Sequence, residues 1–233
     1  MLYDEFPGFW TRVNELNIHY KCTGTGSPVI LVHGGGNDWH EWISNIAFLS
    51  QFFQVYAVDL PGFGLSQMPD GPVSIRWSVE FLKSFMERLR ISRAHVIGHS
   101  LGAMISIALA AQYPELINKL VIIDSGGLGK ISRKGQFLIS IFRIIDLCRG
   151  QKKGPRYQNG HKEEWLVLDQ LPKIKSPVLI VWGQKDLYLP ISHSHLAQSK
   201  IPDSQLHIFP HCGHAPQREC SEIFNNLVLQ FLG

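Results

Sequence analysis

The segment Gly98-His99-Ser100-Leu101-Gly102 contains a serine between two glycines at the G-x-S-x-G spacing. A serine hydroxyl acts as a nucleophile only where it is exposed and lies next to a base. A sharp turn from a strand into a helix exposes it, and the flanking glycines have no Cβ that would clash in so tight a turn. The helix N-terminus also favours developing negative charge. The segment therefore predicts Ser100 as the nucleophile of a hydrolase; the alternative is a glycine turn with a bystander serine.

A nucleophilic serine needs a base, and the base needs an acid that orients it. His214 follows the last apolar run of the chain, and a glycine before it and a proline after it favour it over the nearby His211. Asp186 follows the preceding apolar run, and Asp124 is the second candidate acid. The chain order is then serine, aspartate, histidine. We predict Ser100, Asp186 and His214 as the catalytic residues.

A glycine loop, His33-Gly34-Gly35-Gly36, follows the first apolar run. Backbone N–H groups of such a loop can point at the oxyanion of a tetrahedral intermediate, together with the N–H of Leu101 just after the nucleophile. Gly34, Gly36 and His99 flank these groups, and we expect them to contact substrate. A glycine cluster alone is most often a turn, so its place in the chain order carries the argument.

Six short runs of apolar, largely β-branched residues provide the scaffold for these positions. The runs are apolar on both faces, which indicates parallel strands covered on both sides. We predict strands at Val29–Val32, Val55–Val58, His95–Ile97, Leu120–Ile123, Val178–Trp182 and Leu206–Phe209. The predicted site residues then follow the C-terminal ends of strands, which is the edge where ligands bind in open α/β sheets.

Segments with a helical spacing of apolar residues alternate with these runs. They are Ile75–Leu89, Leu101–Tyr113 and Ser221–Leu232, and the second of them ends before a proline that cannot continue a helix. The alternation predicts an α/β fold with a mostly parallel central sheet and helices on both faces. Trp10–Tyr20 alternates more loosely, which favours an antiparallel hairpin at the sheet edge.

One stretch, residues 126–175, contains no evident strand. It holds an apolar helical segment at Phe137–Cys148 and a helix-like segment at Lys162–Leu171, separated by a polar loop. We predict a core domain formed by residues 1–125 and 176–233. Residues 126–175 are then a small helical cap insertion over the C-terminal edge of the sheet.

The composition limits the classes of partner. The 233 residues carry a formal charge of +3, which is too weak and too scattered to argue for nucleic acid. Arg143 and Asp146 interrupt the longest apolar stretch, so none can span a membrane, and the N-terminus lacks the apolar region of a signal peptide. We expect a small-molecule substrate, no nucleic-acid or membrane partner, a cytoplasmic location, and a monomer or homodimer.

The four cysteines do not form a metal pattern. Cys22, Cys148, Cys212 and Cys220 match no zinc spacing and are too few for a disulfide scaffold at this length. Free thiols in a reducing compartment are the default interpretation. No G-x-G-x-x-G opens a first βαβ unit, so we expect neither a metal nor a cofactor.

Five blocks of the chain resemble the motifs of the α/β-hydrolase superfamily, in the branch of serine hydrolases with an inserted cap. The blocks are His33–Gly36, Asp59–Ser66, Gly98–Gly102, Val181–Asp186 and Gly213–Pro216. The resemblance covers nearly the whole chain except the insertion. It implies Ser100 as nucleophile, Asp186 as acid and His214 as base. It also implies the backbone N–H groups of Gly35 and Leu101 as the donors of the oxyanion hole.

Departures from the family patterns narrow the expected chemistry. Haloalkane dehalogenases and epoxide hydrolases of this superfamily use an aspartate where this chain has Ser100. Members that cleave carbon–carbon bonds in meta-cleavage products usually carry tryptophan directly after the catalytic histidine, where this chain has Ala215. They also draw a substrate-binding arginine from the cap. The insertion Gly126–Lys175 is shorter than most caps of the branch, which implies a more open cleft.

We therefore expect a carboxylesterase-type hydrolase that cleaves esters through an acyl-enzyme on Ser100. One alternative is carbon–carbon bond hydrolysis of meta-cleavage-type dienoates. Another is a ligand-binding receptor on the same scaffold with little turnover, because a fold does not fix a function. Acyl transfer or perhydrolysis, in which an acceptor other than water resolves the acyl-enzyme, is a further alternative.

Overall fold

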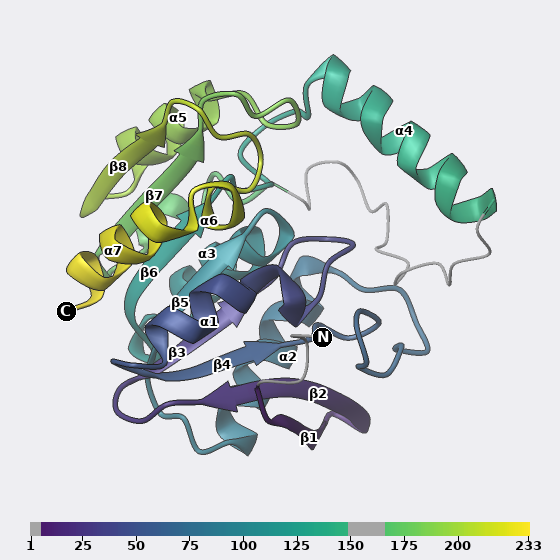
Figure 1. The fold of residues 1–233 in the computed structure, drawn as a ribbon, viewed down its shortest axis with the longest axis vertical. Coiled ribbons are helices and arrows are strands. Elements are labelled where there is room, and N and C mark those ends of the chain that lie inside the picture. Colours follow the sequence, from purple (N-terminus) through teal and green to yellow (C-terminus); the bar gives the residue numbers. More distant parts are fainter. Residues whose placement is uncertain (1–5, 149–165) are drawn as a thin grey trace.

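The computed structural model describes residues 6–148 and 166–233, which form one eight-stranded sheet with helices on both faces (Figure 1). The strand order is β1-β2-β4-β3-β5-β6-β7-β8. The strands are β1 (Gly8–Val13), β2 (Leu16–Thr23), β3 (Pro28–Val32), β4 (Gln54–Val58), β5 (Ala94–His99), β6 (Ile117–Ile123), β7 (Val178–Gly183) and β8 (Ser204–Phe209). The predicted α/β fold with a mostly parallel central sheet is confirmed, and all six predicted strands are present.

The strands from β3 to β8 pair in parallel, whereas β2 is antiparallel to both of its neighbours, β1 and β4. The hairpin β1–β2 turns at Asn14 and Glu15, both with positive φ, and pairs Trp10 with His19. The predicted antiparallel hairpin at the sheet edge is therefore confirmed. Since parallel strands end at one edge of the sheet, the loops after β3, β5, β6, β7 and β8 meet there.

The longer helices agree closely with the sequence prediction. The predicted helices correspond to α2 (Ile75–Arg88), α3 (Leu101–Gln112) and α7 (Ser221–Leu232). Ser74 caps the start of α2, where its side chain accepts a hydrogen bond from the N–H of Trp77. Three short helices were not predicted: α1 (Ile43–Leu49), α5 (Ser192–Lys200) and α6 (Pro216–Glu219).

Each face of the sheet has its own hydrophobic core. Helices α2, α3 and α5 cover one face, where α3 is buried on nearly all sides. Helices α1 and α7 cover the other face, where Trp42 and Phe224 are fully buried. Burial of the sheet on both faces explains why the central strands β3 to β7 contain continuous apolar runs rather than alternating ones.

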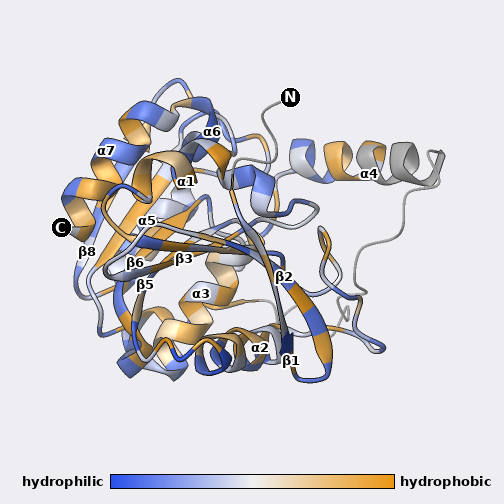
Figure 2. Cartoon of the chain, turned by 60° about the horizontal axis from the view of Figure 1, so that its bottom comes forward, coloured by the Kyte–Doolittle hydropathy of each residue, from blue (hydrophilic) through white to orange (hydrophobic). Residues whose placement is uncertain are grey.

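The predicted insertion is helical at its start and anchored in the core at its ends. Helix α4 (Arg133–Cys148) begins before the predicted Phe137 and projects from the body of the fold (Figure 1). Its first turns carry both hydrophilic and hydrophobic residues (Figure 2). Leu128, Val167 and Leu171 are buried in the core that contains α2 and α3. The division into a core domain and a cap therefore stays a prediction, because residues on both ends of the cap belong to the core.

The second predicted helix of the insertion, Lys162–Leu171, is wrong where the structure describes it. Residues 168–170 form a turn, and a 3₁₀ turn follows at Leu171–Lys173. Pro172 lies at the start of that 3₁₀ turn, and proline is favoured at the first position of a helix rather than after its last turn, which accounts for the difference. The part of this prediction at residues 162–165 lies outside the described residues.

Two further findings concern membrane-spanning helices and cysteines. Within residues 6–148 and 166–233, no helix has both the length and the apolar character needed to cross a membrane. The cysteines whose side chains are described, Cys22, Cys212 and Cys220, are free thiols.

Candidate active site

Ser100 occupies the sharp turn between β5 and α3. Its backbone has φ +51° and ψ −107°, a conformation that is strained for any residue with a Cβ. A Cβ at Gly98 would lie 2.6 Å from the carbonyl oxygen of Gly102, and a Cβ at Gly102 would overlap the carbonyl oxygen of Val32. Both glycines are thus required by close backbone approach, as the motif predicted.

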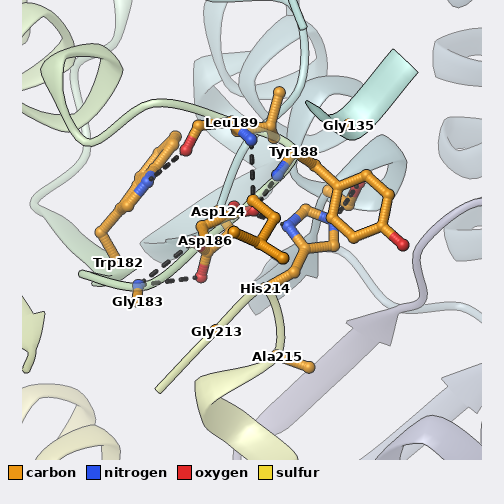
Figure 3. A network of polar contacts seen from close by, with 12 residues as sticks. Asp124, Gly135, Trp182, Gly183, Asp186, Tyr188, Leu189, Gly213, His214 and Ala215 are labelled. Carbon is orange, nitrogen blue, oxygen red and sulfur yellow. Dashed lines mark hydrogen bonds and ion pairs between the residues drawn. The ribbon is translucent and has the colours of Figure 1, made fainter. Parts of the chain in front are cut away.

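His214 and Asp186 lie beside this serine, although more than eighty residues separate each of them from it. The His214 Nε2 is 3.2 Å from the Ser100 Oγ, and the His214 Nδ1 is 2.7 Å from the Asp186 Oδ2. Figure 3 shows His214 and Asp186 side by side, with Asp124 next to Asp186. The Asp186 carboxylate is 1% exposed, whereas the His214 ring is 22% exposed. A hydroxyl, an imidazole and a buried carboxylate are in the order required for general-base activation of a nucleophile. The competitor His211 is exposed, and no contact brings it to Ser100.

The protonation states of this pair suit proton transfer. Burial lowers the pKa of His214 below its ordinary value of 6.5, and the hydrogen bond to Asp186 offsets only part of that effect. Burial alone would raise the pKa of Asp186, but the hydrogen bond and charge of His214 hold it below its usual value. At neutral pH a neutral imidazole therefore faces Ser100 while a charged carboxylate holds its other nitrogen.

Asp124, the second candidate acid, lies directly behind Asp186. Its carboxylate oxygens are 3.1 and 3.3 Å from the backbone N of Gly183. Burial, followed by the charge and hydrogen bond of Asp186, raises its pKa well above the ordinary carboxyl value. The ligand-type atoms of Asp124, Asp186 and His214 lie within 4.8 Å of one another, but the three groups engage each other and backbone N–H groups, which favours orientation of His214 over metal binding.

The two predicted oxyanion donors are neighbours across the site. A Cβ at Gly35 would lie 3.6 Å from the Leu101 Cδ2, and Gly35 itself is exposed. Leu101 is the first residue of α3, where backbone N–H groups lack partners within the helix. Among the hydrogen bonds of the described residues, neither of these two N–H groups has an acceptor outside the helices and strands. Both are therefore free to meet a negative oxygen near Ser100.

The residues expected to contact substrate occupy two different positions. Gly36 is exposed with φ +81°. Gly34 is buried, and its N–H donates to the Glu41 carboxylate at 2.8 Å. His99 is 2% exposed, and both of its ring nitrogens face protein acceptors. Gly34 and His99 thus lie beneath the reacting groups, because their polar atoms already have partners, and a substrate contact by them stays a prediction.

Four polar residues around the site were missed from the sequence. Glu219 accepts hydrogen bonds from the backbone N of Gly213 at 2.7 Å and of Ala215 at 3.1 Å, and so shapes the histidine loop. An acidic residue in a first helical turn often bonds the N–H groups before the helix, so Glu219 carried a usable signal. The Tyr188 ring packs 5.0 Å from the His214 ring. Glu41 and Gln217 gave no signal, because their partners are distant in sequence.

The sequence profile described as alpha/beta hydrolase fold matches residues 27–142 and 149–219. The chain is 30% identical to a 2-hydroxy-6-oxononadienedioate/2-hydroxy-6-oxononatrienedioate hydrolase of Comamonas testosteroni, over 94% of this chain and 92% of the relative. It is also 30% identical, with the same coverage, to a 2-hydroxy-6-oxo-6-phenylhexa-2,4-dienoate hydrolase of Burkholderia cepacia.

Solved structures with similar folds include hydrolases of more than one kind. A meta-cleavage product hydrolase from Pseudomonas fluorescens IP01 superposes with a TM-score of 0.83 at 25% identity, covering 96% of this chain and 97% of that one. A membrane phospholipase A superposes with the same TM-score and identity, covering 97% of this chain and 86% of that one.

Proposed function

The chain belongs to the alpha/beta-hydrolase fold family, and from that premise we propose that it is a serine hydrolase of meta-cleavage-type dienoates, acting through an acyl-enzyme on Ser100. The observation that carries this choice is the similarity to dienoate hydrolases over 94% of this chain and 92% of the relatives. The sequence alone ranked ester hydrolysis first and carbon–carbon hydrolysis second. The comparisons favour the reverse order.

In the proposed reaction, the Ser100 Oγ attacks the ketone carbon of the substrate while His214 takes the hydroxyl proton. The backbone N–H groups of Gly35 and Leu101 hold the oxyanion. The carbon–carbon bond breaks in the keto tautomer of the substrate, in which the 2-hydroxyl proton has moved to the carbon next to the ketone, so the electron pair left on that carbon is delocalised onto the 2-oxo oxygen. His214 returns its proton to this oxygen, which gives the five-carbon hydroxydienoate, and the acyl group remains on Ser100.

Water completes the cycle by the same groups. His214 removes a proton from water, which attacks the acyl carbon and releases a carboxylic acid from Ser100. Asp186 holds the imidazole in the tautomer that has its free nitrogen toward the serine. The balance is one water consumed, one acid formed and one protonated carbon fragment released, with no oxidant or cofactor.

Ester hydrolysis is the second candidate, and three observations favour it. Ala215 follows His214, where dienoate hydrolases of the resembling branch usually have tryptophan. The alignment with the Comamonas testosteroni relative occupies 268 positions whereas this chain has 233 residues, so that relative has segments that this chain lacks. A phospholipase A is among the similar structures. An ester requires the same attack on a carbonyl but no delocalised carbon leaving group.

A substrate panel separates the candidates. The purified chain is given 2-hydroxy-6-oxo-6-phenylhexa-2,4-dienoate and a series of p-nitrophenyl esters, and kcat/KM is measured for each with Ser100→Ala as the control. We expect cleavage of the dienoate to benzoate and a five-carbon hydroxydienoate, and loss of all turnover in the variant.

Three outcomes contradict the proposal in different ways. Efficient ester turnover without dienoate cleavage replaces it with the second candidate. Tight dienoate binding without turnover of either class indicates a receptor. Turnover that survives Ser100→Ala in a folded protein removes the serine mechanism altogether.

A further inference from the structure

A buried ion pair, Glu41 with His99, lies beneath the reacting groups. Glu41 belongs to the 3₁₀ turn Trp39–Trp42, and His99 is the last residue of β5. The Glu41 Oε1 contacts the His99 Nδ1, and the two side chains are 0% and 3% exposed. Two buried charges cost free energy of desolvation unless they are paired and hydrogen-bonded, and even a paired buried ion pair adds little stability. A function in the site would explain why this pair is present.

The contacts of the pair reach three separate parts of the site. The Glu41 Oε2 accepts the N–H of Gly34 in the glycine loop at 2.8 Å. The Glu41 Oε1 accepts the Gln217 Nε2 at 2.7 Å, from the helix that follows the histidine loop. The His99 Nε2 donates to the backbone carbonyl of His214 at 2.6 Å. One ion pair thus joins the oxyanion loop, the strand that carries the nucleophile and the loop that carries the base.

The partners of His99 determine its charge. A carbonyl oxygen only accepts, so the Nε2 that faces the His214 carbonyl must carry a proton. The Nδ1 faces a carboxylate, which favours a second proton there. Burial opposes this charge, but the charge and contact of Glu41 hold the pKa of His99 above its ordinary value. Burial likewise opposes the Glu41 charge, yet His99 lowers the pKa of Glu41 to about 2.

We propose that Glu41 and His99 form a positioning unit for the base: His99 holds the His214 backbone and keeps a fixed positive charge against the His214 ring, so that this ring stays unprotonated to lower pH. The inference deepens the proposed function and rests on it. The two imidazole rings have their centroids 4.8 Å apart, close enough for this charge to act directly. Neither residue touches the reacting atoms.

The other groups that face His214 set the sign of the effect. Asp186 at the Nδ1 favours the protonated ring, and the Ser100 hydroxyl at the Nε2 and the Tyr188 ring are its other neighbours. Burial is the largest cause of the lowered pKa of His214, and the charge of His99 lowers it further, whereas Glu41, on the far side of His99, opposes it more weakly. Removal of the His99 charge must therefore raise the pKa of His214.

The test measures the pH dependence of Ser100 labelling by a fluorophosphonate, which requires the nucleophile and its base but no natural substrate. Glu41→Gln removes the counter-ion, so a buried His99 loses its proton, while the amide still accepts the Gly34 N–H. His99→Gln keeps an amide N–H for the His214 carbonyl and removes the positive charge. Both variants are expected to move the acid limb of the labelling rate to higher pH. Each unit of displacement lowers the rate below the limb about tenfold.

Asp38→Asn is the matched control, because Asp38 lies three residues before Glu41 in an exposed ion pair with His40. Its acid limb is expected to stay with that of the parent. Lower labelling rates in Glu41→Gln and His99→Gln with an unmoved limb would show a merely structural role and overturn the proposal. A parent that is not labelled at Ser100 contradicts the proposed function instead.

A second measurement needs neither activity nor variants. In ¹⁵N-histidine spectra of the parent, His99 is expected to be protonated on both nitrogens at a pH where His214 is neutral. A neutral His99 at pH 7 overturns the proposal, whatever the labelling shows.

Discussion

Asp124 is a buried carboxyl that faces another carboxyl. Because Asp186 is held charged by His214, the shared environment and burial raise the pKa of Asp124 well above its usual value. A carboxyl with a raised pKa in the folded protein lowers the free energy of unfolding as pH rises above its unfolded pKa. The reason is that the unfolded chain then releases the proton while the folded chain still holds it. The free energy of unfolding of the parent therefore falls, relative to an uncharged variant, between the ordinary carboxyl range and the folded pKa.

Asp124→Asn tests this assignment. The amide replaces a protonated carboxyl as donor to Asp186, so we expect nearly parental kcat and a stability advantage over the parent that grows from pH 4 to pH 8. Urea unfolding at both pH values measures the difference. Asp124→Ala is the paired variant, which leaves the N–H of Gly183 without its acceptor and costs about 1 to 3 kcal/mol. An Asp124→Asn protein that loses stability relative to the parent as pH rises would mean that Asp124 is charged.

The pKa of His214 determines where the acid limb of the pH–activity profile is expected. The base works only when unprotonated, and its pKa lies below the ordinary 6.5 because of burial first and then the balance of neighbouring charges. Activity is therefore expected to persist below pH 6.5 and to fall as pH drops through the lowered value. The kcat/KM profile of a slow substrate measures it. A limb above 6.5 would contradict the protonation states described for the site.

The proposed triad could be identified from the sequence at this scale, because each member lies in a local motif at a strand end. Ser100 has its glycines, and Asp186 and His214 follow apolar runs. Glu41 could not be identified, since its partners Gly34, His99 and Gln217 come from three separate elements. The expectation that His99 contacts substrate followed from its place next to Ser100, and nothing in the local sequence reveals that β5 turns its side chain inward.

At the scale of elements, the turn between β5 and α3 leaves no room for a side chain at its glycines. A Cβ at Gly102 would overlap backbone atoms of β3, which cannot move without breaking the sheet. Gly102→Ala is expected to cost more than about 3 kcal/mol or to prevent folding. Gly71→Ala, where a Cβ meets nothing within 4 Å, is expected to stay within about 0.5 kcal/mol of the parent. Comparable unfolding free energies for the two variants would contradict this geometry.

Strands and long helices could be predicted because their pattern is strong, and short helices could not. The central strands β3 to β7 are buried on both faces over most of their length, so each contains a short run of mostly apolar residues. Helix α5, Ser192–Lys200, buries only His193, Ser194 and Ala197, so it shows no apolar periodicity. Helix α1 has seven residues, which is too short for a periodic pattern to stand out.

At the scale of the whole molecule, the insertion and the core are not separate in packing. Leu171 is fully buried in the core beside α3, whereas Phe137 on α4 is 67% exposed. Leu171→Ala is expected to cost about 2 to 5 kcal/mol of unfolding free energy. Phe137→Ser is expected to change it by less than about 0.5 kcal/mol. Equal and small effects would mean that the end of the insertion folds apart from the sheet.

The residues of the site meet because each follows a parallel strand at the same edge of the sheet. The glycine loop, the nucleophile, the acid and the base follow β3, β5, β7 and β8, which lie in the sheet in the same order as in the chain, whereas β4 lies on the other side of β3. The alternation of strands and helices predicts a common edge, but the strand order β4-β3-β5-β6-β7-β8 depends on crossovers that no local pattern encodes. The shared edge could therefore be predicted, and the individual contacts across it could not.

The most direct test of the central claim is to trap the covalent intermediate. The parent is mixed with 2-hydroxy-6-oxo-6-phenylhexa-2,4-dienoate, quenched in acid within a turnover, digested and mapped by mass spectrometry. The account predicts a benzoyl group on the peptide that contains Ser100, and its absence in Ser100→Ala. Dienoate cleavage with no acyl group on Ser100, or an acyl group on another residue, would contradict it.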